Sequence, residues 1–280
     1  EALSGFSNPA VITIAFLFII SHALQKTRIL EYLIVRVRRL ADKSILLGRA
    51  VYLFTIGIAS RREEMIHNVA KEVEMLGGKP IIYQLDVQNQ EQCKNIANDF
   101  ISKYGIDIVI PNAGIGGTDG LFTGTSSDIN LILNTNLLGM TNTLLPFIPE
   151  MKNNRKGKLV CISSVASYVP MPNHGGYASS KIAMRRIFDS WRPSLNHYNI
   201  KTISICPGFV DTAIVNSSIK KIIPMKSADQ AAKAFIKKID LNYKTYIYPW
   251  PYKILILIYK IIPKPLYNYL INKIFSKPIL

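Results

Sequence analysis

The amino-acid sequence predicts an α/β fold in which helices cover both faces of a parallel β-sheet, giving three layers. Two observations lead to this prediction. Strand-like and helix-like segments alternate between about residues 55 and 249, and the strand-like segments are almost continuously apolar, as strands buried on both faces are. The composition agrees, because 280 residues with 49% hydrophobic and 19% charged side chains can bury one sizeable core.

The predicted elements follow one another in a regular order. The strand-like segments are residues 55–60, 80–87, 106–114, 157–164, 200–208 and 244–249. The segments with helical periodicity are residues 62–76, 89–104, 127–153, 175–197 and 227–239. Gly77 and Gly78 end the first helix, and Ser227 suits the N-cap of the last. In such a sheet the carboxyl ends of the strands line the ligand crevice, so functional residues are expected there.

Two hydrophobic extensions flank this single domain, which we place at residues 45–250. Residues 1–44 contain the apolar run 10–21, which is short for a membrane-spanning helix and is followed by several basic residues. The run is either a membrane anchor that leaves the rest of the chain on the cytoplasmic side, or a buried strand or helix. Residues 251–280 mix Ile and Leu runs with lysines and tyrosines, and prolines divide this segment into short helices.

The chain is strongly basic, with 34 Lys and Arg against 18 Asp and Glu and a net charge of +16. Such a balance favours binding to an anionic surface. No nucleic-acid-binding motif accompanies it, and near the C-terminus aromatic and apolar residues lie between the basic ones, so we expect a membrane surface as partner and no nucleic acid. A general lysine bias, or packing of this segment in the core or in a homo-oligomer, would explain the pattern equally well.

The cysteines and histidines form no disulfide framework and no metal-binding motif in the sequence. The three cysteines, Cys93, Cys161 and Cys206, are widely spaced and odd in number, and the four histidines are scattered. A reducing compartment fits this usage best. We therefore expect a cytoplasmic protein, associated with a membrane if the extensions bind one, and no bound metal.

Polar and glycine-rich segments follow three of the predicted strands, namely residues 112–114, Ser163-Ser164 and Pro207-Gly208. The helix at residues 175–197 begins with Tyr177 and Lys181, which are four residues apart and therefore share one side of the helix. An ammonium near a phenol lowers the pKa of the phenol, which would let the tyrosine exchange a proton near neutral pH. The alternative is the start of an ordinary amphipathic helix.

In these motifs the sequence resembles the short-chain dehydrogenase/reductase family over about residues 45–250. Tyr177 and Lys181 resemble the catalytic pair of the classical type, and Ser164 precedes Tyr177 by thirteen residues, the usual spacing. Further motifs in the expected order are "NAG" (112–114), "NTNLLG" (134–139) with Asn136 as the matching asparagine, and "PGFVDT" (207–212). The resemblance implies a Rossmann-like, doubly wound parallel sheet.

The resemblance also implies a reaction, in which a hydride passes between a nicotinamide and the carbon of a carbonyl or alcohol substrate. Tyr177 would exchange a proton with the substrate oxygen, and Lys181 would lower the pKa of Tyr177 and hold the nicotinamide ribose. Ser164 would donate a hydrogen bond to the substrate oxygen, and Asn136 would hold a water in a proton relay. The expected substrate is a small molecule, lipidic if the C-terminal segment lies on a membrane.

The segment after the first predicted strand bears on the choice of cofactor. Family members that use NAD tend to carry an Asp there, whereas this chain has Ser60, Arg61 and Arg62. Guanidinium groups suit a 2′-phosphate, so NADP(H) is favoured over NAD(H), although the two arginines would also suit the start of a solvated helix. The other implied cofactor contacts are Asp86 and Val87 at the adenine, Asn112, Ala113 and Gly114 along the cofactor, Tyr177 and Lys181 at the ribose, and Pro207, Gly208 and Thr212 at the carboxamide.

The sequence departs from the family pattern in the first β-α unit. The glycine-rich turn Thr-Gly-x-x-x-Gly-x-Gly is not found, and its nearest match is "LLGRAV", with Gly48 in the place of the last glycine. Arg61 follows Arg49 by only twelve residues, so this unit is compressed or missing. The chain is then either a damaged or mis-spliced version of an active reductase, or a degenerate, non-catalytic and membrane-associated member that no longer binds a dinucleotide.

Overall fold

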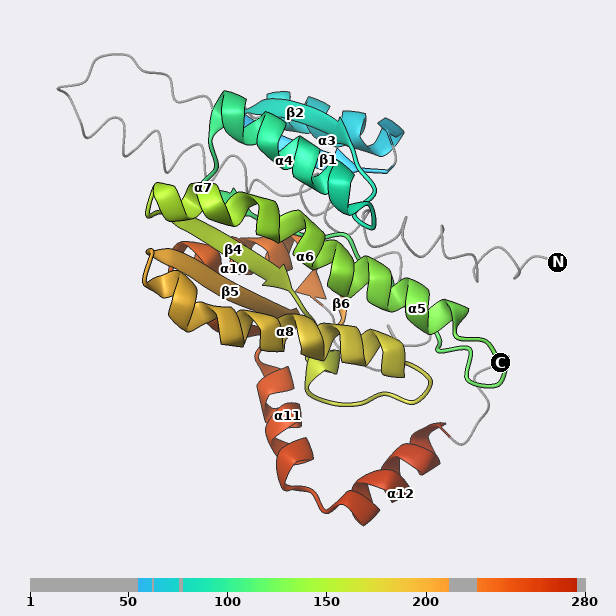
Figure 1. Ribbon diagram of the computed structural model, residues 1–280. Coiled ribbons are helices and arrows are strands. Elements are labelled where there is room, and N and C mark those ends of the chain that lie inside the picture. Colours follow the sequence, from blue (N-terminus) through green and yellow to red (C-terminus); the bar gives the residue numbers. More distant parts are fainter. Residues whose placement is uncertain (1–54, 62, 76–77, 212–225, 276–280) are drawn as a thin grey trace.

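The computed structural model of the protein describes residues 55–61, 63–75, 78–211 and 226–275. Within these residues every paired strand runs parallel to its neighbour, and helices lie on both sides of the strands (Figure 1). The predicted α/β class is thereby confirmed. The predictions for the N-terminal extension, for Gly48, for Arg62 and for Thr212 lie outside the described residues.

A four-stranded parallel sheet forms the centre of the domain, with the strand order β3-β4-β5-β8. The strands are β3 (Ile108–Val109), β4 (Gly157–Ile162), β5 (Ile200–Pro207) and β8 (Thr245–Tyr248). Side chains alternate between the two faces of a strand. In β4, Leu159 and Cys161 pack with Met184 and Phe188 of the helix on one face, whereas Val160 packs with residues of the other face. Because both faces are covered, the stretch of β4 at residues 159–162 is apolar throughout.

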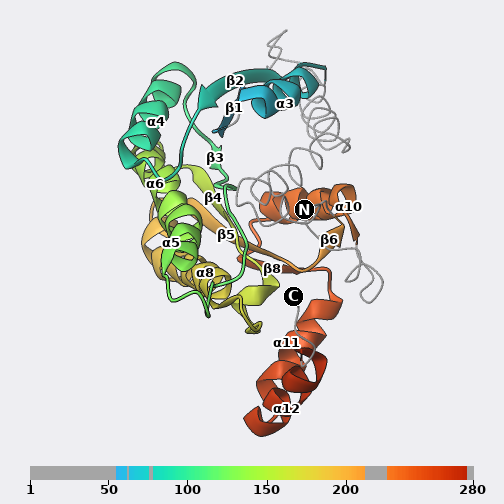
Figure 2. The ribbon, with the colours of Figure 1, turned by 90° about the vertical axis from the view of Figure 1, so that its right-hand side faces the viewer.

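Two helical layers cover this sheet. On one face lie α8 (Gly175–Asn196) and the helical run of residues 127–153, and on the other lies α10 (Ala228–Asp240), whose Ile239 packs on Val160 (Figures 1 and 2). The Ser227 side chain accepts a hydrogen bond from the Gln230 N–H at 3.2 Å, as the predicted N-cap. A short parallel pair that was not predicted, β6 (Val210–Asp211) and β7 (Lys226–Ser227), precedes α10.

A second, two-stranded sheet lies beside the first. β1 (Thr55–Ser60) pairs with β2 (Lys79–Gln84), and α3 (Glu63–Met75) and α4 (Gln90–Tyr104) accompany them. Among the described residues these two strands pair only with each other. A doubly wound sheet has the strand order 3-2-1-4-5-6, so β2 and β1 fill its first two places and β3 its fourth.

The run of residues 127–153 is one continuous rod but not one regular α-helix. It consists of α5 (Ser127–Leu133), the π-helical turn η2 (Asn134–Leu138), α6 (Gly139–Leu144), the 3₁₀ turn η3 (Leu145–Phe147) and α7 (Ile148–Asn153). Pro146 and Pro149 lack the N–H of a regular α-helix, which accounts for the change of pitch there. The rod is long and apolar enough to cross a membrane, but it packs against α4 and α8 as a core helix does.

The two sheets are joined through Val87, which follows β2. The Asn142 side chain of α6 donates a hydrogen bond to the Val87 carbonyl at 2.9 Å. A Cβ added to Gly139 would lie 2.6 Å from the Val87 Cγ2 methyl. The glycine of the "NTNLLG" motif is therefore required for close approach between α6 and the segment after β2.

Two further helices, α11 (Pro251–Ile261) and α12 (Lys264–Phe275), follow β8. They extend away from the sheet layers (Figures 1 and 2), and Figure 1 shows that they form a V. Their boundaries agree with the expectation that prolines divide this segment into short helices. Elsewhere the predicted helices are right to within about two residues, whereas the strand predicted at residues 106–114 is reduced to β3.

We expect Gly139→Ala to lower the free energy of unfolding by about 1–2 kcal/mol, because the overlap with Val87 outweighs the gain of about 1 kcal/mol in helix propensity. Chemical unfolding followed by circular dichroism measures this change. In the Gly139→Ala background, Val87→Ala should restore part of the loss by removing the opposing methyl groups.

Gly117→Ala is the matched control, because its added Cβ would have its nearest neighbour at 3.8 Å. Equal destabilisation by Gly139→Ala and Gly117→Ala would contradict the packing argument.

Candidate active site

The start of α8 is fixed by a loop that follows β3. The two carboxylate oxygens of Asp119 accept hydrogen bonds from the N–H groups of Gly175 at 2.6 Å and Gly176 at 2.8 Å. The His174 ring nitrogen Nδ1 lies 2.8 Å from the Gly117 carbonyl oxygen. A carboxylate at a helix N-terminus is favourable for both hydrogen bonding and the helix dipole. Sequence reasoning missed Asp119, because it lies 56 residues before its first partner.

Tyr177, Lys181 and Ser164 come together at the carboxyl ends of β4 and β5. The Tyr177 hydroxyl is hydrogen-bonded to Ser164, and Ser164 Oγ lies 3.5 Å from the Pro207 carbonyl oxygen at the end of β5. Lys181 Nζ lies 5.7 Å from the centre of the Tyr177 ring and donates a hydrogen bond to the Ile162 carbonyl at 3.0 Å. The hydroxyl, phenol and ammonium that were predicted to converge therefore do so.

Asn136 lies behind these residues in the π-helical turn, with no exposed surface. Its Oδ1 accepts a hydrogen bond from the Ile115 N–H at 2.7 Å, and its Nδ2 donates to the Ile115 carbonyl at 2.9 Å and to Ser180 Oγ at 3.0 Å. Ser180 Oγ in turn donates to the Tyr177 carbonyl at 2.7 Å. The asparagine thus connects the segment after β3 to the turn of α8 that carries Tyr177 and Lys181.

Gly114 lies at the same point, between Asn136 and Lys181. A Cβ added to it would lie 3.2 Å from Asn136 Oδ1 and 3.5 Å from Lys181 Nζ. Ser163 adds a further support, because its hydroxyl donates to the Lys181 carbonyl at 2.8 Å. The sequence analysis named Ser163 only as a polar residue after a strand and did not single out Ser180, although each is a buried hydroxyl adjacent to a predicted site residue.

Burial dominates the electrostatics of the pair. Burial raises the pKa of Tyr177 above its ordinary value, and the hydrogen bond to Ser164 lowers it by a smaller amount. Burial lowers the pKa of Lys181 to about 8, against a smaller opposing effect of Cys161 and Cys206. The net shift of the Tyr177 pKa is therefore upward, opposite to the direction expected from the Lys181 ammonium. The physical reason is that the ammonium is itself buried and bonded to a carbonyl, while the phenolate would lose its hydration.

The residues predicted near the adenine end lie at the carboxyl ends of β1 and β2. Arg61 follows β1, and its Nη1 lies 3.9 Å from Asp86 Oδ2, with both side chains close to half exposed. Asp86 Oδ1 also accepts a hydrogen bond from the Gln88 N–H at 3.0 Å. Ser60 ends β1, while Val87 packs on Gly139 at the joint between the sheets. Arg61 thus lies beside a carboxylate at this edge of the sheet, with its side chain partly exposed to solvent.

The segment after β3 and the segment after β5 complete the site. Asn112 and Ala113 are half-buried and lead directly to Gly114. At the end of β5 the Gly208 N–H donates to the Tyr248 carbonyl at 2.6 Å, and the Gly208 Cα side is closed by the Tyr252 ring of α11. Gly208 therefore contacts α11 closely, a neighbour that the sequence did not predict.

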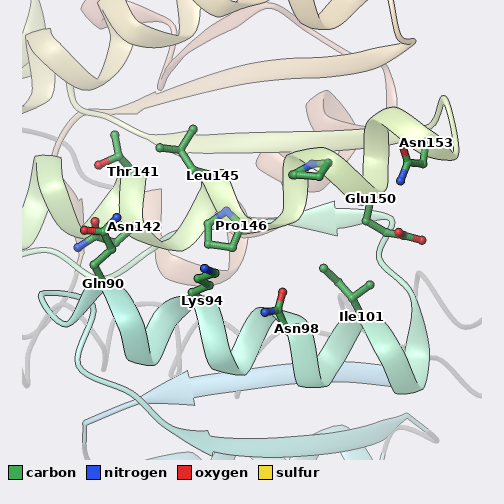
Figure 3. Close-up of a pocket in the computed structure, with 11 residues that line it drawn as sticks. Gln90, Lys94, Asn98, Ile101, Thr141, Asn142, Leu145, Pro146, Glu150 and Asn153 are labelled. Carbon is green, nitrogen blue, oxygen red and sulfur yellow. The ribbon is translucent and has the colours of Figure 1, made fainter.

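A cavity of about 450 Å³ lies between α4 and the α6–α7 part of the rod (Figure 3). None of the predicted site residues lines it. The residues around it are Gln90, Lys94, Asn98, Ile101, Thr141, Asn142, Leu145, Pro146, Pro149, Glu150 and Asn153. Within the part of the chain that the structure describes, no group of three or more His, Cys, Asp or Glu side chains is placed to hold a metal ion.

Comparisons with known proteins identify the family of the chain. The family model described as short chain dehydrogenase matches residues 50–222, which is more than half of the chain. A 3-oxoacyl-[acyl-carrier-protein] reductase of Thermotoga maritima is 31% identical over 160 residues, which cover 57% of this chain and 65% of that protein. The match therefore spans slightly less than two thirds of that relative.

An 11-beta-hydroxysteroid dehydrogenase-like protein of Arabidopsis thaliana is 30% identical over 228 residues, covering 79% of this chain and 73% of that protein. Among solved structures, a short-chain dehydrogenase from Streptomyces avermitilis is similar with a TM-score of 0.65 and 16% identity, over 86% of this chain and 92% of that one. This likeness supports the fold. The family match and the Arabidopsis relative show that the chain belongs to the short chain dehydrogenase family of oxidoreductases.

Proposed function

We propose that the protein is an NADP(H)-dependent oxidoreductase that interconverts a carbonyl and an alcohol. The observation that carries this proposal is the convergence of Tyr177, Ser164 and Lys181 at the ends of β4 and β5. These three side chains supply a proton donor, a hydrogen-bond donor and a cation within one small region. Family membership supports the proposal, because the matched relatives are named reductases and dehydrogenases.

Tyr177 and Ser164 would act on the substrate oxygen. Their hydroxyl groups are hydrogen-bonded to each other, so an oxygen that replaces this bond can accept from both. As negative charge develops on a carbonyl oxygen, two fixed donors stabilise it, and the Tyr177 proton is the one transferred. The raised pKa of Tyr177 keeps the phenol protonated near neutral pH, as the reduction direction requires.

Lys181 and Asn136 would orient the reacting groups. Lys181 Nζ donates one hydrogen bond to the Ile162 carbonyl and lies beside Gly114, so the backbone around it fixes the position of the ammonium. The hydrogen bonds of Asn136 to Ile115 and Ser180 hold this arrangement in place. We propose Asn136 as a positioning residue for Lys181, in addition to any water that it holds.

The donor set fits a nicotinamide dinucleotide along the edge formed by β1, β2 and β3. When bound there, the cofactor would supply or accept the hydride. The absence of a Cβ at Gly114 leaves room close to Lys181 and Asn136, and Arg61 offers a guanidinium for a 2′-phosphate. Asp86, Val87, Asn112 and Ala113 would line this edge, and Pro207 and Gly208 the nicotinamide end. We assign Ser60, Arg62, Gly48 and Thr212 to the same function on the sequence alone.

We further propose that the substrate is a lipidic carbonyl or alcohol. The Arabidopsis relative is named for a steroid substrate class, and the C-terminal helices next to the site carry exposed apolar side chains. A panel of ketosteroids, long-chain ketones and short aldehydes assayed with NADPH tests this assignment. Preference for the short, water-soluble aldehydes would contradict it.

Replacing Tyr177 by Phe should lower kcat by about 10²- to 10⁴-fold, because the transferred proton is lost. NADPH affinity, measured by fluorescence titration, should stay within a few-fold of the original. Tyr104→Phe, on the outer helix α4, is the matched control and should keep full activity. Retained turnover in Tyr177→Phe, or no NADPH binding by the unaltered chain at millimolar cofactor, would refute the proposed function.

Arg61→Ala should weaken NADPH binding by roughly 10- to 100-fold, since a charge-assisted hydrogen bond to the 2′-phosphate is worth about 1.5–3 kcal/mol. The dissociation constant of NADH should be almost unchanged. Lys71→Ala, which removes a cation from the neighbouring helix α3, serves as control. Equal weakening of both cofactors would show that Arg61 does not select the phosphate.

The stability that Lys181 contributes should increase as the pH rises from about 8 towards 10. The pKa of Lys181 is about 8 in the folded chain and 10.5 when unfolded, so in this range the unfolded chain binds more protons. The difference in free energy of unfolding between the unaltered chain and Lys181→Met should therefore grow, by at most about 1.4 kcal/mol per pH unit. Denaturant midpoints at several pH values measure it, with Lys71→Met as control. A difference independent of pH would contradict the burial of the ammonium.

A further inference from the structure

The C-terminal helices carry a concentrated group of exposed apolar side chains. Of the twenty large hydrophobic side chains that are exposed among the described residues, nine lie between residues 250 and 270. We call these nine the C-terminal apolar face. They are Trp250, Ile254, Leu255, Leu257, Ile258, Ile261, Leu266, Tyr269 and Leu270. Because nearly half of these exposed side chains fall within 21 consecutive residues, a chance scatter of single exposed residues is a poor explanation.

The side of α11 opposite to this face is the one that packs on the domain. Tyr252 and Ile256 are 8% and 5% exposed, and they are four residues apart on one side of the helix. Ile254, Leu257 and Ile261 are 49%, 57% and 73% exposed, and their spacing of three and four residues forms a stripe on another side. The helix is therefore apolar nearly all round although only one side is covered by the protein.

The surroundings of the apolar face are basic. Lys253 and Lys260 are exposed and two turns apart, and Lys264 begins α12. After Asp240 the sequence contains six lysines and no Asp or Glu. A partner of this surface must therefore combine apolar material with negative charge.

The exposed aromatic side chains of α11 and α12 indicate which class of partner this surface binds. Trp250 is 68% exposed at the start of α11, and Tyr269 is 63% exposed on α12. Exposed Trp and Tyr beside long lysine side chains are typical of helices that lie in the headgroup region of a bilayer. A second copy of the chain would bring like charges together at a symmetric interface, whereas an anionic bilayer offers both acyl chains and phosphates.

We propose that the C-terminal apolar face docks on the surface of an anionic phospholipid bilayer and holds the candidate active site next to the membrane. Both helices are anchored to segments at the site. The Tyr252 hydroxyl accepts a hydrogen bond from the Phe209 N–H at 3.2 Å, two residues after Pro207. The Tyr267 hydroxyl of α12 donates to the Pro170 carbonyl at 2.9 Å, in the segment between Ser164 and Tyr177.

The placement has a consequence for the substrate, which rests on the proposed function. The two anchored segments follow β5 and β4, the strands whose carboxyl ends carry the candidate catalytic groups. A carbonyl or alcohol dissolved in the bilayer would reach this edge along α11 and α12 without crossing bulk water. The docked surface therefore favours membrane-dissolved substrates over water-soluble ones.

The fluorescence of Trp250 in the full chain tests the docking directly. The chain has two tryptophans, and the other one, Trp191, stacks on Phe188 in the domain, so Trp191→Phe leaves Trp250 as the single reporter. We expect a blue shift and reduced acrylamide quenching with phosphatidylcholine vesicles that contain phosphatidylglycerol, and weaker effects with pure phosphatidylcholine or high salt. Unchanged Trp250 emission would overturn the proposal, even if the chain sediments with the vesicles through another segment.

Surface variants in the Trp191→Phe background give a second test. Leu257→Glu combined with Ile261→Glu should weaken vesicle binding more than 10-fold, whereas Met75→Glu, on the exposed side of α3, should leave it unchanged. Lys253→Glu with Lys260→Glu should remove the dependence on anionic lipid. The proposal would be overturned if a second copy of the chain covers this face. In that case Trp250 would be shielded from acrylamide without vesicles, and the chain would form a dimer that the Leu257→Glu, Ile261→Glu variant does not form.

Activity measurements separate this inference from the proposed function. Tyr177→Phe should keep vesicle binding while losing turnover. The Leu257→Glu, Ile261→Glu variant should keep turnover of a water-soluble aldehyde and lose most of its rate on a long-chain ketone dissolved in vesicles. Equal rates of this variant and the unaltered chain on the vesicle-dissolved ketone would overturn the inference and leave the oxidoreductase proposal standing. Vesicle binding by a chain that oxidises no NADPH would refute the oxidoreductase proposal and leave the docking inference standing.

Discussion

One fully buried amide side chain fixes the geometry on which the candidate site depends. Asn136 is bonded to both backbone polar groups of Ile115 and to Ser180. A buried polar group that loses its partner costs about 1–3 kcal/mol, so the segment after β3, the π-helical turn and α8 are held at one distance. Asn136 Oδ1 and Lys181 Nζ both lie next to Gly114, where an added Cβ would be 3.2 Å from the first and 3.5 Å from the second. The placement of the ammonium is therefore a property of three distant segments together.

The same burial sets the chemistry of the site. Removing Tyr177 and Lys181 from water favours their neutral forms, which raises the pKa of the phenol and lowers that of the ammonium. A protonated phenol next to a serine hydroxyl suits donation to a carbonyl oxygen. The approach of an anionic cofactor would oppose the effect on Lys181, since a nearby negative charge favours the ammonium.

The C-terminal helices connect this site to the outer surface. Tyr252 closes over Gly208 at the end of β5, and its hydroxyl is bonded to the next backbone N–H. The contact leaves no space for a side chain at residue 208, which gives a packing reason for glycine there in addition to any role at the cofactor. Because α11 is held at this point, the surface that it presents is positioned relative to the catalytic groups.

The sequence by itself determined the α/β class, the order of the elements and the identity of the catalytic candidates, because apolar periodicity and short motifs are local signals. The convergence of Tyr177, Lys181 and Ser164 followed from the rule that parallel strands end at one edge. Only the tertiary structure decided that Asp119 holds the start of α8, and that burial raises the pKa of Tyr177. Both depend on partners or surroundings far away in the chain, and solvent exclusion is a property of the packed molecule that no spacing of residues encodes.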